Sequence, residues 1–177
     1  NPRAPGLALA AEAGIPTVGI DPKGLDRDAF EARVQAALDA AEVELVCLAG
    51  FMRLLSAAFV DRWAGRMVNI HPSLLPAFKG LDVHKRVLES GARFSGCSVH
   101  FVTPEVDDGP IIVQAVVPVQ ADDTADSLAE RVLAAEHRIY PLALRWIAER
   151  RLRVDGRRVV VAGAANAGDS PSTSEPA

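Results

Sequence analysis

The order of strand-like and helix-like segments predicts an α/β protein with a Rossmann-like, mostly parallel, twisted sheet and flanking helices. Continuous apolar runs such as "LVCLAG" (residues 45–50) are typical of parallel strands that are buried on both faces. These runs alternate with segments of helical period, and a strand–helix–strand order implies parallel strands joined by right-handed crossovers. Ligands of such sheets bind outside the carboxyl ends of the strands.

The first half of the chain contains two predicted helices and three predicted strands. The first helix covers residues 5–14 and ends at Gly14, the favoured residue just past a helix end. The second begins at Asp26, and its apolar side chains follow the helical period. Those side chains are Phe30, Val34, Leu38 and Ala41. The strands are expected at residues 15–20, 45–50 and 67–71.

The second half begins with a short helix that Asp82 caps and Gly91 ends, with Val83 and Val87 facing inward. Two strands are expected next, and the turn of Pro, Asp and Gly between them favours an antiparallel or long-looped pair. They cover residues 95–103 and 111–119. A long helix opens at Asp123 or Thr124, with a kink expected at Pro141. Its apolar stripe comprises Leu128, Val132, Ala135, Ile139 and Leu142.

The chain is expected to end in a hairpin around Asp155-Gly156, followed by a disordered tail rich in small residues, Ser and Pro. We therefore expect a single domain over residues 1–161 and a tail over residues 162–177. The chain opens at Asn1-Pro2-Arg3 without a methionine, so we expect its numbering to start partway along a longer protein.

Composition restricts the class of function. The 177 residues are 49% apolar, with a net charge of −4, which argues against a nucleic-acid or membrane-surface role. No apolar stretch reaches the ~18 residues of a membrane span, and no signal peptide is visible. Cys47 is predicted to be a buried thiol, and no zinc-type cysteine spacing occurs. We expect a cytoplasmic protein that binds small molecules as a monomer or homodimer.

The strand at residues 67–71 ends in two polar side chains, Asn69 and His71, which share one face of the strand. A lone histidine in an apolar strand is more often structural. At the carboxyl end of a parallel strand, however, an amide can donate to an oxyanion and an imidazole can transfer a proton near neutral pH. The pair suits addition to a carbonyl group.

Other residues could complete such a site. Asp107 or Asp108 in "VDDGP" could orient the histidine, although aspartate before glycine also simply favours a turn. "GFMRLLS" (residues 50–56) is either a strand–helix junction or the wall of a pocket for a flat ligand. Glu136 is either solvated or a ligand for sugar hydroxyls. The four histidines are scattered without the i, i+4 spacing of a zinc pair, so no metal site is expected.

Taken together, these pieces resemble the glycinamide ribonucleotide formyltransferases, folate-dependent enzymes of purine synthesis. The segments that carry the resemblance are "LAGFMRLLS", "NIHPSLLPAFKGLDVH", "SVHFVTPEVDDGPIIVQ" and "EHRIYPL", in family order. The resemblance implies the formyltransferase fold and transfer of a formyl group from 10-formyltetrahydrofolate to the amine of glycinamide ribonucleotide, without a metal.

The resemblance also implies roles for particular residues. Asn69 and His71 would stabilise a tetrahedral intermediate, with His71 as general acid, and Asp107 would pair with His71. Glu136 would hold the ribose hydroxyls. The folate cosubstrate would contact Arg27, Met52, Arg53, Leu54, Leu55, Asn69, Thr103, Pro104, Glu105, Val106 and Asp107.

The chain departs from the family pattern at its start, because the first strand and the phosphate-binding loop of the family do not occur in it. Leu133 also stands where some members carry a polar or basic phosphate contact. Two relatives with the same trio are alternatives: formyltetrahydrofolate hydrolase and methionyl-tRNA formyltransferase. A non-catalytic folate- or nucleotide-binding module is the alternative of a different class.

Overall fold

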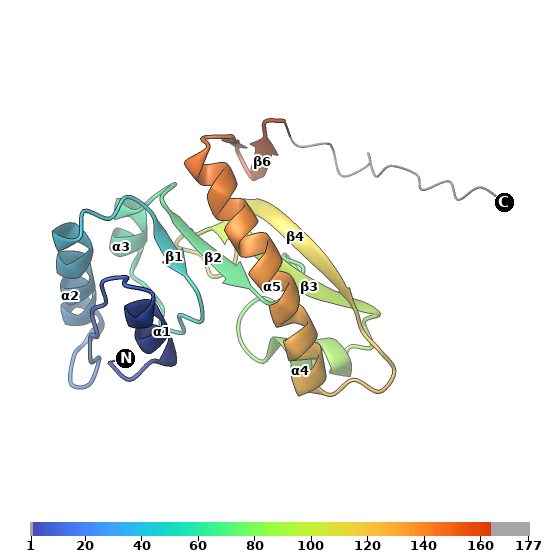
Figure 1. Cartoon of the computed structure of the whole chain (residues 1–177). Coiled ribbons are helices and arrows are strands. Elements are labelled where there is room, and N and C mark those ends of the chain that lie inside the picture. The colour runs from blue at the N-terminus through green and yellow to red at the C-terminus, as the bar shows by residue number, and fades with distance from the viewer. Residues whose placement is uncertain (1, 164–177) are drawn as a thin grey trace. The chain divides into compact units, whose positions relative to one another are not determined.

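The computed structural model of the chain describes residues 2–163, so the tail predicted over residues 162–177 lies outside the described residues from residue 164 onward. The chain divides into two compact units. One comprises residues 2–69 with residues 102–106, and the other comprises residues 70–101 with the described residues from 107 onward. Each unit is an arrangement of strands and helices, as the α/β prediction requires (Figure 1).

The first unit contains α1 (Pro5–Glu12), α2 (Arg27–Ala40), β1 (Val46–Leu48), α3 (Ala57–Arg62) and the start of β2 (Met67–His71). As predicted, Asp26 is the N-cap of α2, and its carboxylate accepts a hydrogen bond of 2.7 Å from the Ala29 amide. The core of the unit is a buried cluster of Phe59, Trp63 and Met67, against which Val34 and Leu38 of α2 pack. The helical period of α2 therefore marks its buried face, as expected.

Two predictions for the first unit are wrong. Residues 15–20 form no strand, and Ile15 and Val18 are 58% and 65% exposed. An apolar run becomes a strand only where a neighbouring strand takes up its backbone hydrogen bonds, and none of the described strands pairs with this run. Cys47 is exposed rather than buried, because β1 is the edge strand and is only partly covered. The continuous apolar run of residues 45–50 predicted a strand buried on both faces, but β1 is not buried on both faces.

The strands form a mixed sheet in the order β1-β2-β3-β4-β6-β5, and β2 runs through both units. β1 and β2 are parallel, with Leu48 opposite Asn69. β3 (Phe94–Phe101) and β4 (Ile111–Pro118) are antiparallel, as their turn predicted, with a register irregularity between Val99 and His100. The irregularity lies near the 102–110 connection, which returns the chain from β3 to β4.

The second unit packs one long helix, α5 (Ala125–Ala148), against β3 and β4 (Figure 1). Thr124 is its N-cap and forms a capping box with Ser127. The predicted stripe supplies the buried side chains Leu128, Val132, Ala135 and Ile139, whereas the fifth buried position is Ala143 rather than Leu142. A helix of 24 residues with one apolar stripe covers one side of this two-stranded part of the sheet.

A short helix and a hairpin complete the second unit. Helix α4 (Val83–Glu89) buries Val83 and Val87 as predicted, but Asp82 makes no side-chain cap because its backbone is left-handed. The predicted hairpin around Asp155-Gly156 consists of β5 (Leu152–Asp155) and β6 (Arg158–Val161). It joins β4 in parallel through one pair, Ile111 with Arg158. The hairpin thereby meets the sheet just after the "VDDGP" turn.

Candidate active site

The last residues of β2 carry the two polar side chains that the sequence singled out. Asn69 and His71 lie two positions apart on this strand, so their side chains share a face. His71 is 6% exposed, although its strand ends at this point and Pro72 follows. A buried histidine needs polar partners for its ring nitrogens, and these come from the loop that follows β2 and from the connection between β3 and β4.

Both ring nitrogens of His71 face oxygen acceptors. Nε2 lies 3.0 Å from the backbone carbonyl of Phe78, and Nδ1 lies 3.3 Å from Oδ2 of Asp107. Both oxygens are acceptors, so the His71 ring lies between two acceptor groups. The structure brings together His71 and Asp107, which sequence spacing alone could not.

Three groups lie next to the Asp107 carboxylate. Besides His71, the Gly80 amide donates a hydrogen bond of 2.9 Å to its Oδ2, and His100 Nε2 lies 3.7 Å from its Oδ1. The Asp107 side chain is 11% exposed. Its backbone is left-handed, with φ of 50°, an arrangement that places the side chain where a regular strand would not.

His100 differs from His71 in its environment. Burial lowers the pKa of His100, which favours the neutral ring. Its Nδ1 lies 2.8 Å from the Phe101 carbonyl, an acceptor, so Nδ1 carries the hydrogen. Two buried histidines, His71 and His100, therefore flank the same carboxylate.

The loop after β2 is fixed to the sheet by a buried hydrogen-bond network. Ser98 Oγ donates to the Ser73 carbonyl at 2.6 Å and accepts from the Leu75 amide at 3.0 Å. Gln114 of β4 donates to both Ser98 Oγ and the Leu75 carbonyl. These hydrogen bonds fix the backbone of residues 73–75. The residues that follow then bring the Phe78 carbonyl to His71 and the Gly80 amide to Asp107.

Sequence reasoning missed His100, Gly80 and the Phe78 carbonyl. His100 had a usable signal, because it stands with Ser98 in a strand whose residues from 95 to 101 are all buried. Buried polar side chains in an apolar strand need partners, and a titratable one is a site candidate. The backbone groups of Phe78 and Gly80 carried no signal, since any residue type offers a carbonyl and nearly any an amide.

The segments that the resemblance assigned to folate belong mainly to the first unit. Met52 and Leu54 are 73% and 71% exposed, while Leu55 packs on the Phe59 cluster and Arg53 stacks 4.5 Å from the centre of the Phe30 ring. Exposed apolar side chains beside anchored ones are typical of a ligand-contacting segment.

The anchor of this segment is Glu31 of α2. Its carboxylate is 7% exposed and accepts hydrogen bonds from the Ser56 amide, at 2.6 Å, and from the Ser56 hydroxyl. The second predicted segment, Thr103 to Val106, follows Val102, which packs on the same Phe59 cluster. Val106 is 52% exposed. Leu55 of the first segment and Val102, just before the second, therefore pack on the same cluster within this unit.

The remaining predicted residues are spread over the two units. Arg27 is the exposed first residue of α2 and pairs with Asp28 at 3.7 Å. Glu136 lies on α5 of the second unit, where partial burial raises its pKa. Within residues 2–163, no group of three or more His, Cys, Asp and Glu side chains is arranged to hold a metal ion. No helix in that described range is both long and apolar enough to span a membrane.

Comparison with known proteins places this geometry in a family. Residues 1–144 match the model of the formyl transferase family. The chain belongs to the formyl transferase family. It is 46% identical over 162 residues to the phosphoribosylglycinamide formyltransferase of Escherichia coli (strain K12), covering 87% of this chain and 76% of that protein.

Other formyl transferase relatives are multifunctional proteins. The chain is 53% identical over 150 residues to the trifunctional purine biosynthetic protein adenosine-3 of Gallus gallus, but 84% of the chain spans only 15% of that protein's length. Among solved structures, glycinamide ribonucleotide transformylase 1 from Symbiobacterium toebii has a TM-score of 0.87 and 50% identity. The match covers 90% of this chain and 76% of that one.

Proposed function

We propose that this protein transfers the formyl group of 10-formyltetrahydrofolate to the amine of glycinamide ribonucleotide, a step of purine biosynthesis. The observation that carries the proposal is the contact of buried His71 with Asp107 at the carboxyl end of β2, in a chain of the formyl transferase family. The names of its relatives support the choice of acceptor. Residues 1–161 act as one catalytic domain in this proposal.

The reaction begins with attack of the substrate amine on the formyl carbon, which gives a tetrahedral intermediate with a negatively charged oxygen. The Asn69 amide donates a hydrogen bond to that oxygen, and His71 also stabilises it. His71 then acts as general acid toward the departing folate nitrogen. Asp107 pairs with His71 and keeps its ring oriented, and protons lost by the amine leave through water near Asp107.

Binding of the folate donor falls to two segments, Met52 to Leu55 and Thr103 to Val106, together with Asn69 and Asp107. The exposed Met52 and Leu54 side chains offer apolar surface to the flat ring system. Arg27 meets the glutamate end of the donor. Glu136 accepts hydrogen bonds from the ribose hydroxyls of the acceptor. No metal takes part.

The proposal is tested by incubating the purified full-length protein with 10-formyltetrahydrofolate, with and without glycinamide ribonucleotide. Formyl transfer predicts that the donor loses its formyl group only when the nucleotide is present, with formation of the formylated nucleotide. Loss of the formyl group in both mixtures, with release of formate, would instead identify a hydrolase. Binding of donor without turnover in either mixture would identify a non-catalytic binding module.

A further inference from the structure

The turn of the β5–β6 hairpin reaches the residue next to Asp107. Arg157 donates one hydrogen bond of 2.7 Å from Nη1 to Asp108 Oδ2, and a second of 3.0 Å from Nη2 to the Asp108 backbone carbonyl. A guanidinium that binds the carboxylate and the carbonyl of one residue fixes its side chain and its main chain together. Arg157 thus restrains the backbone that carries Asp107.

The opposite oxygen of the same carboxylate is held by a second cation. Lys79 pairs with Asp108 Oδ1, and its neighbour Gly80 donates to Asp107. Two adjacent acids are therefore bound by two adjacent residues of the loop that follows β2. The Arg157 guanidinium and then Lys79 hold the pKa of the Asp108 carboxyl well below its usual range, so this carboxylate stays charged throughout the neutral range.

The backbone at this point needs such restraint. Asp107 is in the left-handed region, which is less favourable than the right-handed region for a residue with a β-carbon, although aspartate tolerates it better than most. The β5–β6 hairpin pairs with β4 at Ile111 and Arg158, so the Arg157 turn sits beside the segment that needs holding. The hairpin lies beyond the residues 1–144 that match the family model.

We propose that Arg157 is a positioning residue for formyl transfer, which acts through Asp108 to hold the Asp107 carboxylate against His71. The inference rests on the proposed function for its catalytic meaning, but the positioning itself is a property of the protein without ligands. Arg157 touches neither His71 nor substrate in this scheme, and its effect reaches the reaction only through the position of Asp107.

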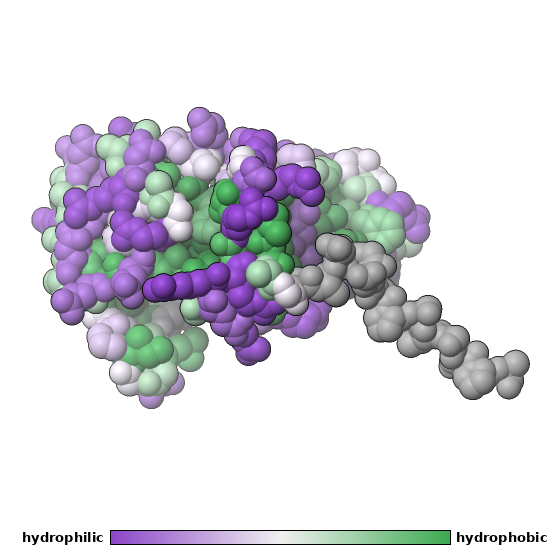
Figure 2. Space-filling view, turned by 90° about the horizontal axis from the view of Figure 1, so that it is seen from above, coloured by the Kyte–Doolittle hydropathy of each residue, from purple (hydrophilic) through white to green (hydrophobic). Residues whose placement is uncertain are grey.

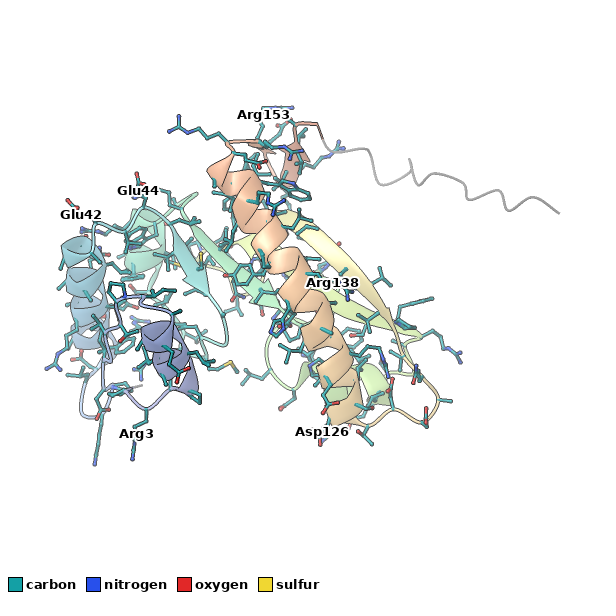
Figure 3. The ribbon with its side chains drawn as sticks, viewed as in Figure 1. Arg3, Glu42, Glu44, Asp126, Arg138 and Arg153 are labelled. Carbon is teal, nitrogen blue, oxygen red and sulfur yellow. The ribbon has the colours of Figure 1, made fainter. Side chains whose placement is uncertain are left out.

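The Gly80 amide reports that position without any assay of activity, because its hydrogen-bond acceptor is Asp107 Oδ2. In Arg157→Ala we expect hydrogen exchange of the Gly80 amide to be about tenfold faster, while amides of the β3–β4 ladder keep their rates. Arg153→Ala is the matched control. It removes the same charge from the same hairpin, and Arg153, labelled in Figure 3, pairs with the exposed Asp155 at 3.5 Å.

The kinetic arm separates positioning from binding. Arg157→Ala should lower kcat about tenfold with KM for both substrates within about twofold, since a displaced carboxylate impairs the transition state more than ground-state binding. Arg157→Lys keeps the charge and one hydrogen bond, so it should restore part of the loss. The Arg157 side chain is 71% exposed, so its removal leaves the core intact.

Unchanged Gly80 exchange in Arg157→Ala, or an equal change in Arg153→Ala, would overturn the positioning. Faster Gly80 exchange with an unchanged kcat would show that Arg157 positions Asp107 but that this positioning does not matter for catalysis. If the wild-type protein transfers no formyl group at all, the proposed function fails, and the exchange arm still decides whether Arg157 positions Asp107.

Discussion

At the residue scale, side chains of the same type have different environments in this protein, and the properties of the site depend on those environments. His71 and His100 both face Asp107, but the other ring nitrogen of His71 meets the Phe78 carbonyl and that of His100 meets the Phe101 carbonyl, and burial lowers the pKa of His100. The two cysteines differ as well, because Cys97 is fully buried in β3 and Cys47 is exposed on the edge strand. Residue type alone distinguishes neither pair.

Replacing His71 by alanine should lower kcat by at least about 100-fold, the usual scale of general acid catalysis. The measurement is the turnover of 10-formyltetrahydrofolate with saturating glycinamide ribonucleotide. His137→Ala, at an exposed position of α5, is the control and should stay within about twofold of wild type. An unchanged kcat in His71→Ala would remove His71 from the mechanism.

The two thiols should react at different rates. Burial raises the pKa of Cys97 to about 11 and removes it from solvent, so an aromatic disulfide reagent at pH 8 should modify Cys47 alone in the folded protein. In denaturant both should react. Cys47→Ser should abolish the fast phase, and a fast phase that persists in this variant would show that Cys97 is accessible.

At the scale of elements, β3 supplies the support for the loop between β2 and α4. Ser98 holds the loop by hydrogen bonds, and Gly96 lets it approach the strand closely. A β-carbon at Gly96 would lie 2.0 Å from the Ala115 carbonyl oxygen and 2.8 Å from Leu74 Cδ2. β3 therefore needs a small residue at position 96, because Ala115 and Leu74 lie close, and a hydroxyl at position 98, because it bonds the loop.

Ser98→Ala should lower the free energy of unfolding by about 1–3 kcal/mol, because it leaves the buried Leu75 amide and Ser73 carbonyl without their partner. Urea unfolding followed by circular dichroism measures it. Ser90→Ala is the control, since the Ser90 hydroxyl makes only local bonds: it donates to the Val87 carbonyl of its own helix and accepts from the exposed Ala92 amide. Equal losses in the two variants would contradict the assigned role of Ser98.

Gly96→Ala should destabilise the protein by about 1–3 kcal/mol, the usual cost of inserting a group into a packed site. Gly6→Ala provides the comparison, because a β-carbon at Gly6 meets nothing within 4 Å and the residue lies in α1. That change should be neutral or stabilising, as alanine is the better helix former. A Gly96→Ala protein as stable as wild type would show that β3 and β4 can separate without loss.

At the scale of the whole molecule, charge is distributed rather than concentrated. The net charge is −4, and Figure 2 shows hydrophilic and hydrophobic residues interspersed on the face that it presents. Against this mixed surface, a few carboxylates have specific cationic partners. Arg131 first, and then the Gln120 amide, lower the pKa of Asp123, as Arg157 and Lys79 do for Asp108.

The lowered pKa values of these groups predict that the free energy of unfolding falls as the pH is lowered, in two separate pH ranges. Burial lowers the pKa of His100 and His84, so the unfolded chain takes up protons first as the pH drops below ~6.5. Because the pKa values of Asp108 and Asp123 are lowered in the folded protein, the unfolded chain again takes up protons first below ~3.9, and stability falls a second time. The urea midpoint should therefore decline in two ranges. His100→Gln should flatten the upper range and Arg131→Met the lower one, and unaltered profiles would refute the assignment.

What the sequence determined by itself is local. The caps at Asp26 and Thr124, the apolar stripe of α5 and the Asp155-Gly156 turn all depend on residues within one or two turns of each other, and the structure has them where the pattern predicted. The polar end of β2 was equally visible, because Asn69 and His71 interrupt an apolar strand.

The tertiary structure decided which distant groups meet. Residues 15–20 and β1 have the apolar character of buried strands, but only pairing and coverage by other elements could make them so. Likewise Asp107, Gly80 and Arg157 reach their places through the β3–β4 connection, the loop after β2 and the terminal hairpin. Contacts between residues this far apart in the sequence depend on how the strands and helices pack. The local pattern of residue types along the chain does not specify that packing.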